Sequence, residues 1–100
     1  MIFAALLEAA ERGELILAPG GMCRFHRRRD GVVVIREIIV LPERRREGIG
    51  RILIQEIRSR HPGADLVARC PEEYEANKFW EAMGFECDDP GAINGWWLHS

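Results

Sequence analysis

The segment from Val32 to Arg60 constrains the fold of this chain more than any other part of its 100 residues. Val32 to Leu41 is apolar and β-branched on both faces apart from Arg36 and Glu37, a pattern typical of a strand in the middle of a sheet. Gly48 to Arg60 places apolar residues on one stripe and charged residues opposite, which predicts an amphipathic helix. A strand followed by a crossover helix leads to a parallel neighbour, so a mixed sheet is expected.

Shorter patterns give the remaining elements. Apolar or alternating runs predict strands, helical spacing predicts two further helices, and glycine and proline mark the turns. The expected elements are a helix over residues 3–10 that ends at Gly13, a helix that opens at Pro71 and ends at Gly84, and strands at Glu14–Ala18, Met22–Arg28, Asp65–Cys70, Phe85–Cys87 and Trp96–His99. This order predicts one α+β domain over residues 1–100, with a mixed and mostly antiparallel sheet, a splayed central parallel strand pair and about three flanking helices.

Composition excludes several classes of function. The formal net charge of -2 gives no overall attraction to nucleic acid, so nucleic acid is not an expected partner. Glu8 and Glu11 interrupt the apolar start before a signal or membrane segment is complete, so no membrane association is expected. Cys23, Cys70 and Cys87 lie far apart and the histidines are scattered, so neither disulfides nor a metal are expected, and a cytoplasmic location fits. The core of such a small domain is small, so a ligand or a homodimer would add to its stability.

The junction between the central strand and its helix has the chemistry of an anion site. The first turn of a helix leaves backbone N–H groups unpaired and carries the positive end of the helix dipole. Glycines at Gly48 and Gly50 would let a phosphate approach this backbone without meeting a Cβ atom. The run Arg44–Arg46 adds charge and forked donors. The junction therefore predicts binding of a phosphate-bearing ligand, although the two glycines could also serve close packing.

Two motifs in this region resemble those of a known family. Arg45-Arg46-Glu47-Gly48-Ile49-Gly50, preceded by Val40-Leu41-Pro42, resembles the Arg/Gln-x-x-Gly-x-Gly/Ala coenzyme A signature of the GNAT superfamily of N-acetyltransferases. Ala76 to Phe85 is similar to the Ala-x-x-Phe/Leu-Tyr-x-x-x-Gly-Phe stretch of the same family. The resemblance covers Val32 to Phe85 and implies a compact GNAT-like fold, in which the family's usual first strand and two helices are shortened.

The resemblance implies that acetyl-CoA is the cofactor. The amides of Arg46 to Gly50 would hold its pyrophosphate, and the backbone of Ile39 to Leu41 would pair with the pantetheine arm like an added strand. The residues that the resemblance assigns to cofactor binding are Ile39, Val40, Leu41, Arg45, Arg46, Glu47, Gly48, Ile49, Gly50, Arg51 and Asn77.

The resemblance also implies a reaction in which a small-molecule or peptide amine attacks the thioester directly in a ternary complex. Such a reaction uses a base for the ammonium and a proton donor for the thiolate that leaves. Glu37 is the expected base, because it is a carboxylate in an otherwise apolar strand, although it could equally be the cross-strand partner of Arg36 or Arg24. Trp80 stands where many family members have the tyrosine beside the departing sulfur, and Tyr74 is a substitute donor.

Other interpretations of these residues remain open. Trp80 and the shortened N-terminal third favour a non-catalytic acyl-CoA-binding or interaction module, and a basic-loop nucleic-acid binder is a weaker third interpretation. Phe79 and Met83 lie on the apolar stripe of their helix and are expected in the core. Cys70, at a strand end, could accept an acyl group or be a buried apolar side chain. Glu73 occupies a position where the family often has asparagine.

Overall fold

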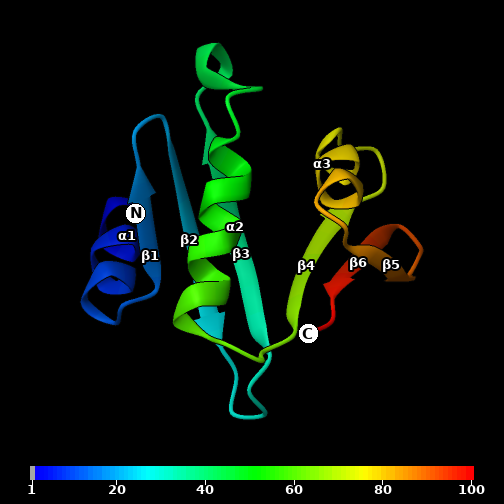
Figure 1. Ribbon diagram of the computed structural model, residues 1–100, viewed down its shortest axis with the longest axis horizontal. Helices are drawn as coiled ribbons and strands as arrows, with labels where there is room; N and C mark the ends of the chain where they lie inside the picture. Colours follow the sequence, from blue (N-terminus) through cyan, green and yellow to red (C-terminus); the bar gives the residue numbers. More distant parts are fainter. Residues whose placement is uncertain (1) are drawn as a thin grey trace.

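Figure 1 shows the computed structural model, which describes residues 2–100 apart from the side chains of residues 2, 3 and 89. The described residues form three α-helices, one short 3₁₀ helix and six strands. The elements are α1 (Ile2–Glu11), β1 (Leu15–Ala18), β2 (Gly21–Arg27), β3 (Val33–Val40), η1 (Pro42–Arg44), α2 (Ile49–Arg60), β4 (Leu66–Pro71), α3 (Ala76–Ala82), β5 (Glu86–Asp89) and β6 (Ile93–Leu98). Within residues 2–100, no helix has both the length and the hydropathy that crossing a membrane requires.

The strands form one six-stranded sheet in the order β1-β2-β3-β4-β6-β5. The β3–β4 pair is parallel, and the other neighbours run antiparallel. This topology confirms the predicted α+β class, with a mixed sheet and a central parallel pair. The connection between β3 and β4 contains α2, the crossover helix that the parallel pairing requires.

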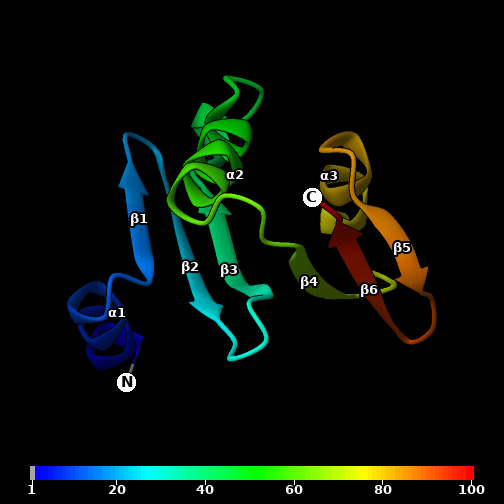
Figure 2. The ribbon, with the colours of Figure 1, turned by 60° about the horizontal axis from the view of Figure 1, so that its bottom comes forward.

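Helices cover both faces of the sheet. α2 packs on β1, β2 and β3 through the buried side chains of Ile49, Leu53, Ile54 and Ile57. Ile52, which helical spacing also places near this stripe, is exposed. Figures 1 and 2 show α1 on the opposite face, against β1 and β2, while α3 packs on β4, β5 and β6. Because each fully buried aliphatic side chain contributes about 1.5–3 kcal/mol, the α2 stripe is a main anchor of the fold.

The sheet divides between its two central strands. β3 and β4 pair only through Val33–Ile35 and Leu66–Ala68. Beyond these residues, β3 stays with β2 as far as Val40, and β4 stays with β6 as far as Pro71. From Arg36 to Val40, the edge of β3 that faces β4 therefore has no strand beside it within the described chain. Figure 2 shows how the half-sheet of β1, β2 and β3 diverges from the half-sheet of β4, β6 and β5.

A β-bulge marks the point of divergence. Arg24 pairs with Glu37, while the next residue of β2, Phe25, pairs with Ile35, so Arg36 is an extra residue in β3. A bulge bends its strand and increases the local twist. The bend coincides with the point where β3 leaves β4.

The helix that the sequence predicts from Pro71 begins later, at Ala76. Pro71 is the last residue of β4, and the amide of Glu72 still bonds to the carbonyl of Ala92 (3.0 Å), so the chain stays extended here. A turn closed by the amide of Tyr74 on the carbonyl of Pro71 (3.1 Å) then leads into α3. Glu72 and Glu73, which follow Pro71 in the sequence, therefore lie before α3 and not in its first turn.

The side chain of Asn77 joins α3 to the preceding turn and to β6. Its Nδ2 donates to the carbonyls of Pro71 (2.8 Å) and Tyr74 (2.7 Å). Its Oδ1 accepts from Nδ2 of Asn94 (3.1 Å) and from the indole Nε1 of Trp96 (2.8 Å). Its donors and its acceptor are thus used within the protein, which does not fit the cofactor contact that the resemblance implies.

Asn77→Ala should lower the free energy of unfolding by about 2–4 kcal/mol, because each hydrogen bond contributes about 1 kcal/mol and partners left unpaired cost more. Urea unfolding measures the change. Lys78→Ala, at an exposed neighbour in the same helix, is the matched control and should change stability by about 0.5 kcal/mol or less. Equal stability of the two variants would show that the network does not hold α3.

Candidate functional site

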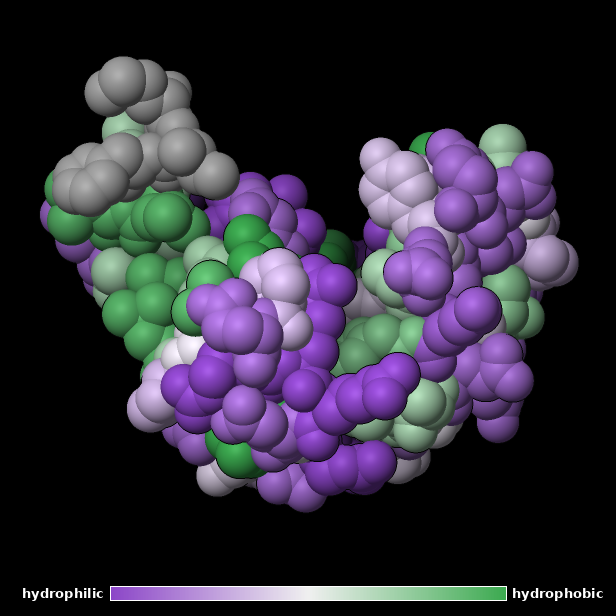
Figure 3. Space-filling view, turned by 90° about the horizontal axis from the view of Figure 1, so that it is seen from above, coloured by the Kyte–Doolittle hydropathy of each residue, from purple (hydrophilic) through white to green (hydrophobic). Residues whose placement is uncertain are grey.

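A cleft of about 850 Å³ lies between the two half-sheets. One wall is the loop after β3 with the first turn of α2, the other is α3 with the turn before it, and Ile38 and Val40 of β3 lie between them. Figure 3 views the molecule from this end and shows a hollow with hydrophilic side chains on both sides and hydrophobic atoms inside it. The volume falls in the range of about 300–1,000 Å³ that is usual for ligand sites.

Arginines give the α2 wall its charge. Arg44 is held by Glu47 in an ion pair of 2.9 Å. Arg45 donates from Nε to a backbone carbonyl of β3 (3.4 Å). Within the described part of the chain, Arg45, Arg46 and Arg51 have no ion-pair partner, although all three line the cleft. These three side chains are therefore available to an anionic ligand.

The N-terminus of α2 opens onto the same wall. Its N-cap, Gly48, has a φ of 80°, which glycine adopts without strain, and no side chain caps the helix. The amides of the first turn therefore keep their hydrogen-bonding capacity. A Cβ atom at Gly48 would meet nothing within 4 Å, so the space above it is open. Arg46 is left-handed as well, with a φ of 70°, and strain of this kind clusters at ligand sites.

Gly50 permits contact between the two walls. A Cβ atom at this position would lie 2.5 Å from Cε1 and 2.9 Å from Cζ of Phe79 on α3. The ring of Phe79 therefore packs directly on the backbone of α2 and bridges the half-sheets. The two glycines of the motif differ in their surroundings, because the space above Gly48 is open and Gly50 serves close packing.

The turn between β1 and β2 supports the α2 wall. A Cβ atom at Gly21 would lie 2.7 Å from Cγ2 of Ile49, and one at Gly20 would lie 2.9 Å from its Cδ1. Gly20 also accepts a hydrogen bond from the amide of Leu41 (2.8 Å). The sequence identifies only a turn here, because the partner of this glycine pair is distant along the chain.

The open edge of β3 presents backbone groups to the cleft. The amide of Leu41 points toward the β1–β2 turn, where it is hydrogen bonded. Backbone groups alternate sides along a strand, so those of Ile39 point the same way and those of Ile38 and Val40 point to the open edge. The hydrogen bond from Arg45 to the carbonyl of Val40 agrees with this direction. Of Ile39, Val40 and Leu41, which the resemblance assigns to the pantetheine arm, only Val40 has its N–H and C=O groups on the open edge. The backbone groups of Ile38 point to the same edge.

The α3 wall combines acidic and apolar side chains. The turn before α3 contributes Glu73, Tyr74 and Glu75, and the helix side contributes Phe79 and Met83. Phe79 and Met83, which the helical stripe predicts as core, pack against the core and line the cleft at the same time. Tyr74 is exposed and also lines this wall.

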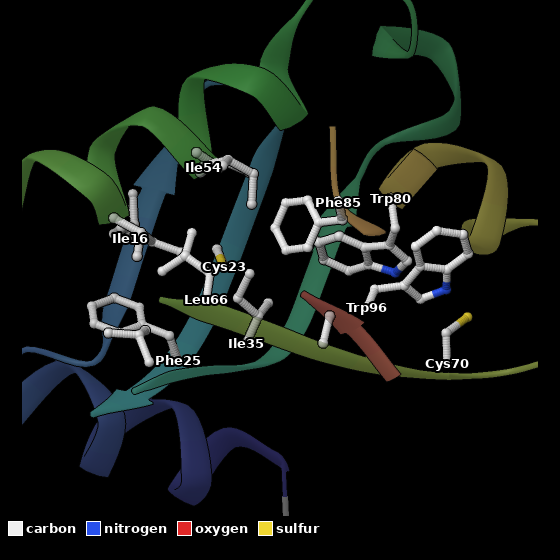
Figure 4. Packing of buried hydrophobic residues seen from close by; sticks show 14 of the residues in the cluster. Ile16, Cys23, Phe25, Ile35, Ile54, Leu66, Cys70, Trp80, Phe85 and Trp96 are labelled. Carbon is white, nitrogen blue, oxygen red and sulfur yellow. The ribbon is translucent and has the colours of Figure 1, made fainter. Parts of the chain in front are cut away.

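Trp80 does not line the cleft. Its indole is buried, with its centroid 5.0 Å from the rings of both Phe79 and Phe85. Figure 4 shows it beside Phe85 and Trp96 among the core side chains. A packing role therefore accounts for Trp80 without any chemistry. Glu47 also lies outside the cleft lining, since its carboxylate is held in the ion pair described above.

Glu37 lies on the other face of β3, toward α1. Its Oε1 accepts a hydrogen bond of 2.6 Å from Nη2 of Arg24, its register partner on β2. Pairing with Arg24 is one of the two roles that the sequence allows for Glu37, the other being that of the catalytic base. The side chain of Glu37 is 29% exposed, so it is accessible from the α1 side and not from the cleft.

Cys70 is poorly suited to nucleophilic chemistry. Burial, and then the charge of Glu73, raise the pKa of the Cys70 thiol. The reactive thiolate is therefore scarce at neutral pH, and the side chain belongs to the hydrophobic core. Among residues 2–100, no group of three or more His, Cys, Asp or Glu side chains is placed to hold a metal ion.

Comparison with known sequences agrees with this geometry. The family model of the acetyltransferase (GNAT) domain matches residues 3–87. No curated protein sequence matches the chain.

Solved structures share the fold at low sequence identity. A GNAT-family protein from Desulfovibrio desulfuricans has a TM-score of 0.72 and 18% identity, covering 96% of this chain and 75% of its own. A protein from Bacillus anthracis str. Ames, assigned as a streptothricin acetyltransferase and crystallised with acetyl coenzyme A, has a TM-score of 0.63 and 21% identity, over 81% of this chain and 56% of its own. Arabidopsis thaliana Naa50, in complex with the bisubstrate analogue CoA-Ac-MVNAL, has a TM-score of 0.60 and 21% identity, over 80% of this chain and 65% of its own. The chain thus spans less than two thirds of the length of these last two proteins.

Gly50→Ala should lower the free energy of unfolding by about 1–3 kcal/mol, because the new methyl group overlaps the ring of Phe79. In a Phe79→Leu background the same change should cost less, since the shorter side chain gives the methyl group room. A double-mutant cycle by urea unfolding measures this coupling. Gly48→Ala is the control, with a backbone cost of about 1 kcal/mol that should be equal in both backgrounds. Additive effects of Gly50→Ala and Phe79→Leu would contradict the contact.

Proposed function

The chain belongs to the GNAT acetyltransferase family, and on this basis we propose that it transfers an acetyl group from acetyl-CoA to a primary amine by direct attack in a ternary complex. The observation that carries the proposal is the cleft wall on which the open Gly48 lies beside arginines that have no ion-pair partner in the described chain. Two structures with this fold hold acetyl coenzyme A or a CoA-containing analogue, which gives the class of ligand that we assign to the cleft.

The α2 wall suits the phosphates of CoA. The amides at the uncapped start of α2 and the loop before it are donors without a capping side chain, and Gly48 lets an oxygen come close to them. Arg45, Arg46 and Arg51 supply the charge for the pyrophosphate and the 3′-phosphate. These contacts would hold the anionic end of the ligand on this wall.

The open edge of β3 suits the pantetheine arm. The arm contains amide groups, which can pair with the backbone of Ile38 and Val40 as an added strand would. Phe79 and Met83 supply apolar surface on the opposite side of the cleft. The arm would thus run along β3 toward the point where β3 and β4 separate.

When bound, acetyl-CoA would supply a thioester whose carbonyl carbon forms the new C–N bond as its C–S bond breaks, while the amine loses one proton and the thiolate gains one. Glu37 is the residue that we propose to take the ammonium proton. It lies next to the bulge at the point of separation, and the contact with Arg24 fixes its orientation. Tyr74, which lines the cleft, is the donor that we propose for the thiolate, whereas the buried Trp80 packs α3 in the core.

A second candidate function is a non-catalytic acyl-CoA-binding module. The commitment of Glu37 to Arg24 and the burial of Trp80 favour it, because both leave the cleft with fewer groups for proton transfer. This candidate uses the same wall for the cofactor. It differs from the enzyme in predicting binding without transfer.

Arg45→Ala and Arg46→Ala should each raise the Kd for CoA about 10- to 100-fold, since a charge-assisted hydrogen bond contributes about 1.5–3 kcal/mol. The loss should shrink as salt is raised, because ions screen the remaining attraction. Isothermal titration calorimetry at two salt concentrations measures both effects. Arg58→Ala removes the same charge from an exposed position of α2 outside the cleft and should leave the Kd unchanged. If Arg45→Ala, Arg46→Ala and the salt concentration all leave the Kd for CoA unchanged, these arginines do not bind the phosphates.

Glu37→Gln should keep CoA binding and lower turnover about 10²- to 10⁴-fold, the usual contribution of one general base. The difference from the wild type should close at high pH, because an amine that is already neutral no longer needs deprotonation. Steady-state rates across pH measure this convergence. Equal rates for the two proteins at neutral pH would exclude Glu37 as the base.

A further inference from the structure

Resting on the function proposed above, we infer that the acceptor is a small amino-carboxylic acid bound in a second cavity. This cavity lies between α1 and the bulged part of β2 and β3. The carboxylate would bind to Arg36 and Arg12, and the amine would face Glu37.

The second cavity has a volume of about 200 Å³. It is lined by Glu8 and two alanines of α1, by Arg12 after the helix, and by side chains of β2 and β3 that include Arg24 and Arg36. It lies on the face of the sheet that carries α1, whereas the cofactor cleft lies on the side of α2 and α3. A volume of this size, about six to seven water molecules, suits a compact ligand better than a folded peptide.

The bulge places a cation that lines this cavity next to an anion that does not line it but is held by a lining residue. Arg36 is the extra residue of β3, and it lines the cavity. Its neighbour Glu37 is held by Arg24, which lines the same cavity. A cation and an anion thus come from consecutive residues at the point where β3 leaves β4. An amine at Glu37 would be next to the place that the cofactor assignment gives to the thioester.

Several charged groups of the cavity are already paired. Glu14 is in contact with His26 (2.6 Å), and Arg24 is in contact with Glu37 (2.6 Å). Arg12 and Arg36 have no ion-pair partner within residues 2–100. Glu8 of α1 also lines the cavity without an ion-pair partner in this range, so the unpaired groups that a ligand would meet are two cations and one anion.

This arrangement discriminates between kinds of amine. A simple alkylammonium ion could pair with Glu8 or Glu37 but would leave Arg12 and Arg36 without an anion, and a polycation would be repelled by these two arginines. An amino-carboxylic acid offers a carboxylate to the arginines and an ammonium to Glu37, so each charge is matched. The cavity therefore selects the zwitterion over an amine of the same length without a carboxylate.

The test compares matched acceptors on the full chain with saturating acetyl-CoA. Glycine, β-alanine and 4-aminobutyrate are each compared with the amine that lacks the carboxylate, namely methylamine, ethylamine and propylamine. Values of kcat/KM are corrected for the neutral fraction of each amine. At least one amino acid should exceed its matched amine by about tenfold or more.

Arg36→Ala should lower kcat/KM for the preferred amino acid about 10- to 100-fold through KM and leave its matched amine unchanged. Arg12→Ala should act in the same direction. Arg29→Ala removes an equal charge from an exposed position outside the cavity and is the control. Calorimetric titration with CoA on each variant reports folding and cofactor binding independently of transfer.

The outcomes separate the two proposals. Absence of CoA binding by the wild type overturns the proposed function. CoA binding with transfer that is equal or faster for the carboxylate-free amines overturns the acceptor inference alone, and so does an Arg36→Ala effect that is the same on both members of a pair. CoA binding without transfer to any of the amino acids overturns the acceptor inference and favours the binding module.

Discussion

β3 and β4 are joined by three residue pairs, and the candidate site depends on where that pairing stops. If the two strands stayed together, the edge of β3 would be occupied and α2 and α3 would close over one continuous sheet. Because they separate after Ile35, β3 keeps an open edge and the two helices stand apart as walls of a cleft. The bulge at Arg36 lies at the same point, so Glu37, the next residue, lies beside the place where the two strands separate.

The walls differ in a way that would orient a ligand. The α2 wall carries arginines that are free of ion pairs in the described chain. The α3 wall carries Glu73 and Glu75, together with the apolar side chains of Phe79 and Met83. An anionic group is attracted by the first wall and repelled by the second. The two half-sheets meet through the short β3–β4 pairing and through the contact of Phe79 with Gly50. A ligand that contacts both walls would therefore raise the free energy of unfolding. Such linkage matters most in a small domain with a small core.

Local patterns were sufficient for the part of the fold that forms the α2 wall. A long β-branched run, a basic loop and an amphipathic stripe follow each other without a break, and they predict a strand, a loop and a helix in that order. The parallel pair followed from the crossover helix alone. The open space at Gly48 agrees with the predicted approach of a phosphate, which stays a prediction.

Contacts between distant segments decided what local patterns could not. In the sequence, a proline that ends a strand cannot be distinguished from a proline that begins a helix. The hydrogen bond from the amide of Glu72 to the carbonyl of Ala92 keeps the chain extended after Pro71, so Pro71 ends β4 and does not begin α3. Gly50 and Phe79, and Asn77 and Trp96, meet only in the folded chain. The position of Trp80 in its motif suggested chemistry, but its burial follows from the aromatic neighbours that the fold brings together.

Chemical-shift mapping of backbone amides during titration with CoA tests whether the ligand lies between the start of α2 and the open edge of β3. We expect the amide signals of Arg46–Gly50 to shift together with those of Ile38 and Val40, while the amide signals of β5 stay in place. ATP, which has phosphates and no pantetheine arm, should leave Ile38 and Val40 unmoved. Shifts confined to other surfaces, or a titration with CoA that leaves both the start of α2 and the open edge of β3 unchanged, would contradict it.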